Sequence, residues 1–97
     1  MNKIDQYKEV LKIELPYLQE KYSVSEIGVF GSYVRLENKE DSDLDILVKF
    51  DEYPSLFKYL DLQQYLTEKL GVKVDLVHKD SLKKYIGKRI LSEVQYL

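Results

Sequence analysis

The sequence predicts an α/β protein in which helices flank a small mixed β-sheet. Segments whose apolar residues recur every three or four positions take turns with segments in which apolar and polar residues alternate. This order is typical of helices layered on a sheet. The chain has 97 residues, the size of one compact unit, so we expect residues 1–97 to form a single domain. Its 44% hydrophobic and 33% charged residues argue against a disordered chain.

The first half of the chain predicts a helix, a strand and a turn region. Residues 4–22 carry apolar side chains at helical spacing, although Pro16 is expected to kink or interrupt the helix. Residues 26–31 are rich in β-forming side chains and end in a glycine, which indicates a short strand. The next five residues are expected to form a short helix opened by Ser32, and the polar residues up to Ser42 a loop.

The second half repeats the alternation of strands and helices. Residues 43–50 alternate strictly between apolar and other side chains, which predicts a second strand. A helix from Pro54 is expected to stop at the next glycine, because glycine is favoured just past a helix end. Residues 72–77 alternate again and predict a third strand. Asp80 is expected to cap a last amphipathic helix that reaches the final leucine.

The sequence predicts whether four particular side chains are buried or exposed. Tyr7, Tyr59 and Tyr85 fall where helix faces are expected to be buried, so we expect them to pack in the core. His78 is the one histidine and follows the third strand, where we expect it at the surface.

Composition excludes several classes of function. The sequence has no cysteine, which rules out disulfides, zinc-thiolate sites and thiol nucleophiles. A formal net charge of -2 gives no broad attraction to nucleic acid, so we expect no direct nucleic-acid binding. No apolar run reaches the length of a membrane span and the amino terminus is polar, so we expect a cytoplasmic protein. A chain this small has little stability to spare, and an oligomer or complex is compatible with it.

Three acids in the predicted strands are candidate metal ligands. Asp43 and Asp45 stand two apart, so both carboxylates leave the same face of a strand, separated by about 6 to 7 Å of rise. Asp75 lies opposite the aliphatic face of the third strand. If the two strands are neighbours, the three carboxylates converge and repel one another unless a cation lies among them. Oxygen ligands of this kind favour Mg²⁺ that completes its shell with water and phosphates.

A candidate phosphate site precedes these acids. Gly31 and Ser32 lie at a strand-to-helix turn, where glycine lets the backbone approach a ligand and free amide groups face an anion. The Ser32 hydroxyl can donate to a phosphate oxygen, and Arg35 follows about one turn later. The turn and the acids together predict a site for a metal-bound nucleoside triphosphate.

The segment GSYVRLENKEDSDLDILV resembles the signature of the DNA polymerase beta-type nucleotidyltransferase superfamily. A Gly-Ser pair, ten further residues and Asp-x-Asp form the defining spacing of that family. The resemblance implies the nucleotidyltransferase fold, two Mg²⁺ ions bound by Asp43, Asp45 and Asp75, and Asp75 as general base. It also implies that Gly31, Ser32 and Arg35 hold the triphosphate of ATP or another nucleoside triphosphate. One departure is the leucine after Arg35, where many members carry glycine.

Among members of that superfamily, the size and the ending RILSEVQYL are similar to the minimal nucleotidyltransferases of prokaryotes. This resemblance implies an antitoxin of a type VII toxin–antitoxin pair, which transfers AMP from ATP to a tyrosine of a small helical HEPN toxin. Two alternatives stay open at this point. One is transfer to a small molecule, as in aminoglycoside nucleotidyltransferases, and the other is an antitoxin that acts by binding alone.

Overall fold

The computed structural model describes residues 2–97, which form helices, four strands and one short 3-10 helix. The elements in chain order are α1 (Lys3–Tyr22), β1 (Val24–Phe30), β2 (Leu44–Phe50), α2 (Leu56–Leu70), β3 (Val74–His78), η1 (Lys79–Ser81), α3 (Lys84–Glu93) and β4 (Gln95–Tyr96).

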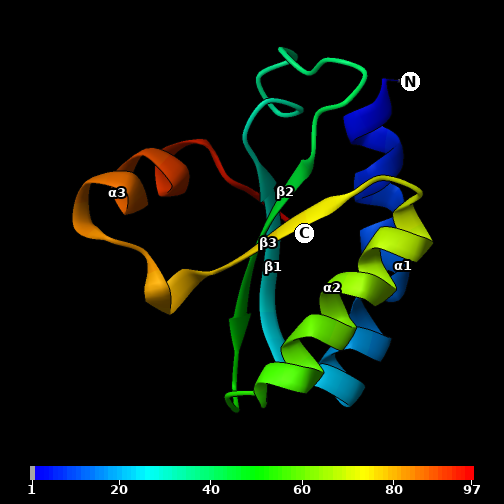
Figure 1. The fold of residues 1–97 in the computed structure, drawn as a ribbon, viewed down its shortest axis with the longest axis vertical. Coiled ribbons are helices and arrows are strands. Elements are labelled where there is room, and N and C mark those ends of the chain that lie inside the picture. The colour runs from blue at the N-terminus through cyan, green and yellow to red at the C-terminus, as the bar shows by residue number, and fades with distance from the viewer. Residues whose placement is uncertain (1) are drawn as a thin grey trace.

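The strands form one mixed sheet in the order β3-β2-β1-β4. β1 pairs antiparallel with β2 and with β4, whereas β2 and β3 run parallel. Helices α1 and α2 lie on one side of the sheet, and α3 lies on the other (Figure 1). The predicted mixed sheet flanked by helices is confirmed.

The main core lies between the sheet and helices α1 and α2. The apolar face predicted for β2 is buried in this core, and so are the apolar side chains of both helices that face the sheet. Each large aliphatic side chain removed from water in this way contributes about 1.5 to 3 kcal/mol. The most completely buried members from these elements are Leu11, Leu18, Leu44, Ile46, Val48, Leu62 and Leu66.

A smaller core lies on the opposite face of the sheet. Phe30 and Leu47 pack there against Ile90 of α3. Leu47 follows Asp45 by two positions in β2, so the two side chains leave the same face of the strand. Helix α3 therefore covers this face beside the candidate acids.

Helix α1 begins and ends as its sequence dictates. The Asn2 side chain accepts a hydrogen bond from the Asp5 amide at 3.2 Å, and Ser23 ends the helix in a left-handed conformation with φ 59°. The helix runs unbroken through Pro16, so the expected interruption does not occur. Buried Leu11 and Leu18 anchor the turns before and after the proline to the sheet.

The end of the chain differs from the prediction. Asp80 lies in η1 and does not cap α3, which begins after Lys83 and ends at Glu93. The chain then becomes extended, and β4 pairs with the free edge of β1. This pairing depends on Gly28, where an added Cβ would lie 3.0 Å from the Gln95 carbonyl oxygen. Side-chain spacing does not encode this backbone pairing with a distant strand. The pairing therefore makes the residues after Glu93 extended, although their apolar side chains have helical spacing.

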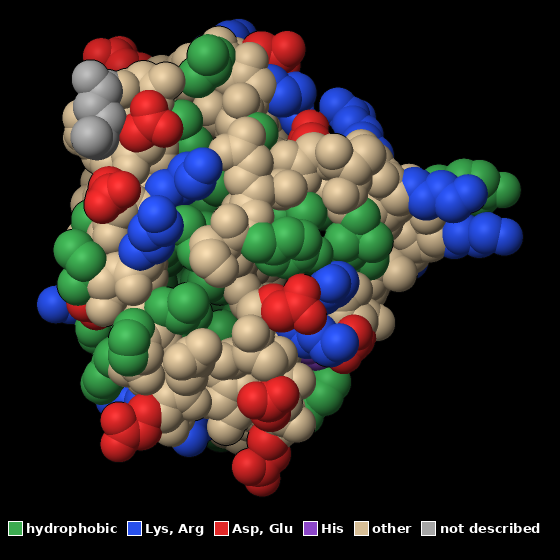
Figure 2. All heavy atoms as spheres, turned by 180° about the vertical axis from the view of Figure 1, so that it is seen from behind, with side chains coloured by type: hydrophobic (Ala, Val, Ile, Leu, Met, Phe, Trp, Pro, Cys, Tyr) green, Lys and Arg blue, Asp and Glu red, His purple; other side chains and the backbone are tan. Residues whose placement is uncertain are grey.

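Two side-chain environments were also predicted wrongly. Tyr85 is 84% exposed on α3, because that helix buries a narrow face, whereas Tyr7 is buried as expected and Tyr59 half-buried. Figure 2 shows α3 projecting from the body with basic and apolar side chains on its surface. His78 is 6% exposed and contacts the Phe50 and Tyr53 rings, with its Nδ1 hydrogen-bonded to the Tyr53 hydroxyl. Within residues 2–97, no helix is long and apolar enough to cross a membrane.

Candidate active site

Asp45 and Asp75 are brought together by the parallel pairing of β2 and β3. Their Cα atoms are register partners, and the apolar residues beside them, including Leu44 and Val74, turn to the opposite, buried face. Both carboxylates therefore leave the sheet on the same face, as the sequence predicted. Asp45 is half-buried, and Asp75 is exposed.

The surroundings of Asp45 disfavour its negative charge. Burial raises the pKa of Asp45 to about 6, and the neighbouring carboxyls of Asp75 and Asp43 contribute to this rise. Arg35 opposes this shift as a nearby positive charge. A carboxylate whose charge is disfavoured by burial and by neighbouring carboxylates is stabilised when a cation binds beside it.

Asp43 lies immediately before β2, at the edge of this pair. Its side chain is 41% exposed, and one carboxylate oxygen lies 4.0 Å from Nζ of Lys73. The amide of Leu44 donates to the Lys73 carbonyl at 2.8 Å, which fixes the chain next to Asp43. In the described part of the chain, no three acidic, histidine or cysteine side chains lie close enough together to hold a metal ion in their present positions. The three aspartates supply the oxygen ligands that a hard divalent cation prefers, and their mutual repulsion gives such a cation a role.

Gly31 joins the Gly31-Ser32 turn to the acids. Its φ is 81°, and a Cβ placed on it would lie 2.0 Å from Oδ2 of Asp45. A left-handed conformation and a contact this close admit glycine alone. The backbone of the Gly-Ser turn is therefore seated directly against the Asp45 carboxylate, and the two halves of the sequence motif form one site.

Residues after Gly31 form a series of turns and not the expected short helix. The amides of Val34 and Arg35 both donate to the Gly31 carbonyl at 3.1 Å, and the Glu37 amide reaches back to Ser32. Leu36 has a φ of 59°, a conformation that glycine adopts without strain, which explains why glycine suits this position. Within residues 2–97, the Ser32 hydroxyl has no hydrogen-bond partner, so it is available to a ligand.

Arg35 lies near the turn but is engaged by two glutamates. Its Nε donates to Glu37 at 3.0 Å, and its Nη1 donates to both carboxylate oxygens of Glu93 at 3.0 and 2.9 Å. Glu93 also accepts the Gly31 amide at 3.1 Å. Sequence reasoning missed Glu93, because it follows Gly31 by 62 positions and no local spacing links them.

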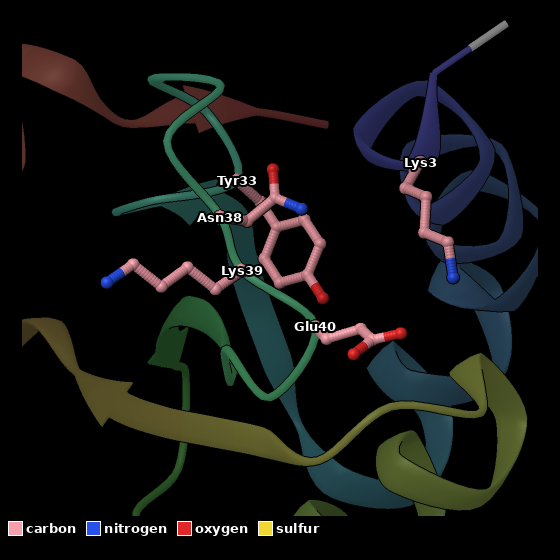
Figure 3. A pocket seen from close by; sticks show the side chains of 5 residues that line it. All are labelled: Lys3, Tyr33, Asn38, Lys39 and Glu40. Atoms are coloured by element: carbon pink, nitrogen blue, oxygen red, sulfur yellow. The ribbon is translucent and has the colours of Figure 1, made fainter.

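A cavity of about 270 Å³ opens beside the turn, between the loop before β2 and the start of α1. Figure 3 shows Lys3 of α1 facing Tyr33, Asn38 and Glu40 of the loop across this space, with Lys39 also at its lining. The Tyr33 side chain is buried, meets Tyr7 edge to face at 5.5 Å between ring centroids and donates to the Ser42 carbonyl at 3.3 Å. Tyr33 thus supports the loop and also borders the cavity.

A mixed sheet with a glycine–serine turn packed against strand carboxylates is the arrangement expected of a nucleotide-transferring domain. The family model described as a nucleotidyltransferase domain matches residues 11–97, and the chain belongs to this family. It is a nucleotidyltransferase, and the resemblance seen in the sequence is confirmed. Nucleotidyltransferases of this family generally use a divalent metal ion.

Individual relatives agree with this assignment. The chain is 52% identical, over 97% of its length and 95% of the relative's, to the protein adenylyltransferase MntA of Thermococcus cleftensis. A solved structure described as a minimal nucleotidyltransferase has a TM-score of 0.76 and 33% identity, and the match covers 100% of this chain and 97% of that one. The fold also matches a chain from a tri-AMPylated Shewanella oneidensis HEPN toxin in complex with its MNT antitoxin, at a TM-score of 0.68 and 21% identity. That match covers 93% of this chain and 70% of the other.

Proposed function

We propose that the protein transfers AMP from ATP to a tyrosine hydroxyl of a HEPN-type toxin and thereby acts as its antitoxin. The proposal is supported by the contact between the Gly31 backbone and the Asp45 carboxylate, because the Gly31-Ser32 turn, the candidate phosphate site, lies directly against a candidate metal ligand. The relative in Thermococcus cleftensis, called a protein adenylyltransferase, supports AMP as the transferred group and a protein as acceptor.

The triphosphate binds at the Gly-Ser turn in this proposal. Gly31 leaves the backbone free of a side chain, so phosphate oxygens can approach the turn closely. The unpartnered Ser32 hydroxyl donates to one of these oxygens, and the Arg35 guanidinium supplies the positive charge. This arrangement orients the α-phosphorus toward the acids and holds the pyrophosphate that leaves.

Asp43, Asp45 and Asp75 hold two Mg²⁺ ions in the proposed complex. When bound, these ions neutralise charge on the phosphates and on the reacting oxygens. The raised pKa of Asp45 supports this assignment, because a cation among the carboxylates offsets the repulsion that contributes to the raised pKa. The partly exposed side chain of Asp43 can adjust its position when the ligands arrive.

Asp75 is the proposed general base. It is the exposed member of the Asp45–Asp75 pair, so an acceptor hydroxyl can reach it from solvent. The acceptor oxygen forms a bond to the α-phosphorus while the bond from phosphorus to the pyrophosphate oxygen breaks. The hydroxyl proton passes to the Asp75 carboxylate.

The acceptor is tested with the toxin encoded beside this protein, if it has the HEPN sequence pattern Arg-x4-6-His. The purified pair is incubated with ATP labelled at the α-phosphate and Mg²⁺, and the toxin is analysed by peptide mass spectrometry. We expect one or more AMP groups on tyrosine, and none with the Asp45→Asn protein. Neutralisation of the toxin without any AMP attached would favour an antitoxin that acts by binding, and label on a small molecule would favour the other alternative.

A further inference from the structure

The Glu93 carboxylate binds Arg35, the guanidinium that the proposed function assigns to the triphosphate. It accepts the Gly31 amide at 3.1 Å and both of its oxygens accept from Nη1 of Arg35. A carboxylate and a phosphate present similar pairs of anionic oxygens to a guanidinium, and each binds it with charge-assisted hydrogen bonds. The two ligands therefore compete for the same side of Arg35.

The charge balance around Arg35 favours such competition. In residues 2–97 its ion pairs are with Glu37 and Glu93. The Glu37 side chain is 65% exposed, so water screens its charge, whereas the Glu93 side chain is 19% exposed. Glu93 therefore neutralises the charge of Arg35 more strongly than Glu37 does. Its negative charge also adds to that of the aspartates toward which the triphosphate must come.

Helix α3 delivers Glu93 to this position. Glu93 is the last residue of the helix, and Val94 follows in an extended conformation that leads into the two-residue strand β4. Few side chains anchor the helix to the sheet, because its buried residues are Gly87 and Ile90. A carboxylate at the end of a lightly anchored helix can leave its site at small cost in core packing.

We propose that Glu93 is a resident anion of the nucleotide site, which the triphosphate displaces from Arg35 and which thereby lowers the affinity for nucleotide. This inference rests on the proposed function for the position of the triphosphate. It makes Glu93 a residue that sets nucleotide affinity and links the occupied site to the end of α3.

The Glu93→Gln protein separates the charge of Glu93 from its shape. The glutamine carbonyl can still accept a hydrogen bond from the Gly31 amide, whereas residue 93 no longer neutralises the charge on Arg35. Calorimetry with inorganic tripolyphosphate and Mg²⁺ measures the effect without requiring any transfer reaction. We expect about tenfold tighter binding than in the wild type, because one competing charge-assisted pair is removed. Unchanged or weaker binding would overturn the inference and make Glu93 a support for the turn.

The Glu37→Gln protein is the matched control, since it removes an exposed carboxylate from the same guanidinium without touching Gly31. Its tripolyphosphate affinity should rise by less than that of Glu93→Gln, and an equal rise would show that any neighbouring charge has this effect. If Glu93→Gln does not fold, Glu93→Asp shortens the side chain by one methylene and should also tighten binding. AMP transfer is measured separately. If Glu93→Gln tightens binding but the wild type transfers no AMP, the proposed function is contradicted and the role of Glu93 stands. If the wild type transfers AMP but Glu93→Gln does not tighten binding, the role of Glu93 is contradicted and the proposed function stands.

Discussion

Gly31 and Asp45 touch in a way that leaves no room for a side chain on Gly31. The glycine directly follows β1 and the aspartate lies at the start of β2, and the antiparallel pairing of these strands sets Phe30 beside Asp45. The turn that follows Gly31 and the acid that it contacts are therefore held by the sheet itself. Rigid strands position both groups more accurately than flexible loops can.

Gly31→Ala is expected to destabilise the protein and to abolish transfer. The new Cβ would lie 2.0 Å from Oδ2 of Asp45, and the φ of 81° is strained for alanine. Together these effects should lower the free energy of unfolding by about 2 to 4 kcal/mol, measured by urea denaturation. Gly71→Ala is the control, because its φ is 68° but nothing lies within 4 Å of the added Cβ. That change should cost about 1 kcal/mol, and equal losses in the two variants would show that the contact with Asp45 is unimportant.

Ser32→Ala is expected to weaken triphosphate binding while leaving stability unchanged. The hydroxyl has no partner in residues 2–97, so its removal breaks no hydrogen bond of the fold. A lost hydrogen bond to a charged phosphate corresponds to about 1.5 to 3 kcal/mol of binding free energy. Calorimetry with ATP and Mg²⁺ measures this loss, and a thermal melt checks the fold. A lowered melting temperature with unchanged ATP affinity would instead assign Ser32 to the structure of the turn.

The metal-free protein should become more stable, relative to Asp45→Asn, as the pH falls from about 7 to 4. The pKa of Asp45 is about 6 in the folded protein, against an ordinary value of 3.8 for an aspartate in an unfolded chain, so the folded state binds the proton more tightly. Its ionised form therefore costs stability at neutral pH, and that cost disappears as the carboxyl is protonated. Because Asp45 is half-exposed, we expect a gain of about 1 to 2 kcal/mol relative to Asp45→Asn, which lacks the group. Unfolding curves for both proteins in EDTA measure the difference, and parallel pH profiles would contradict the assignment.

The sequence predicted those parts of the fold that depend on local spacing. The alternation around Asp45 and Asp75 placed both acids on one face, and the pairing of their strands completed the geometry. The turn at Gly31 was also foreseen, although its residues form turns and not a helix. The burial of His78 and the ion pair between Glu93 and Arg35 depend on which distant segments pack together. No periodicity in a single sequence encodes those contacts.

A comparison of AMP transfer and stability between Asp45→Asn and the wild type tests the enzymatic role of Asp45. Asparagine has the same size but is a weaker metal ligand, so the loss of transition-state charge stabilisation should lower the transfer rate by at least about a hundredfold. The same change removes a repelled charge, so the melting temperature in EDTA should hold or rise. The measurement pairs a thermal melt without metal with transfer from labelled ATP to the HEPN partner. Loss of transfer in a protein at least as stable as the wild type is the predicted result, and transfer at the wild-type rate would contradict the enzymatic role of Asp45.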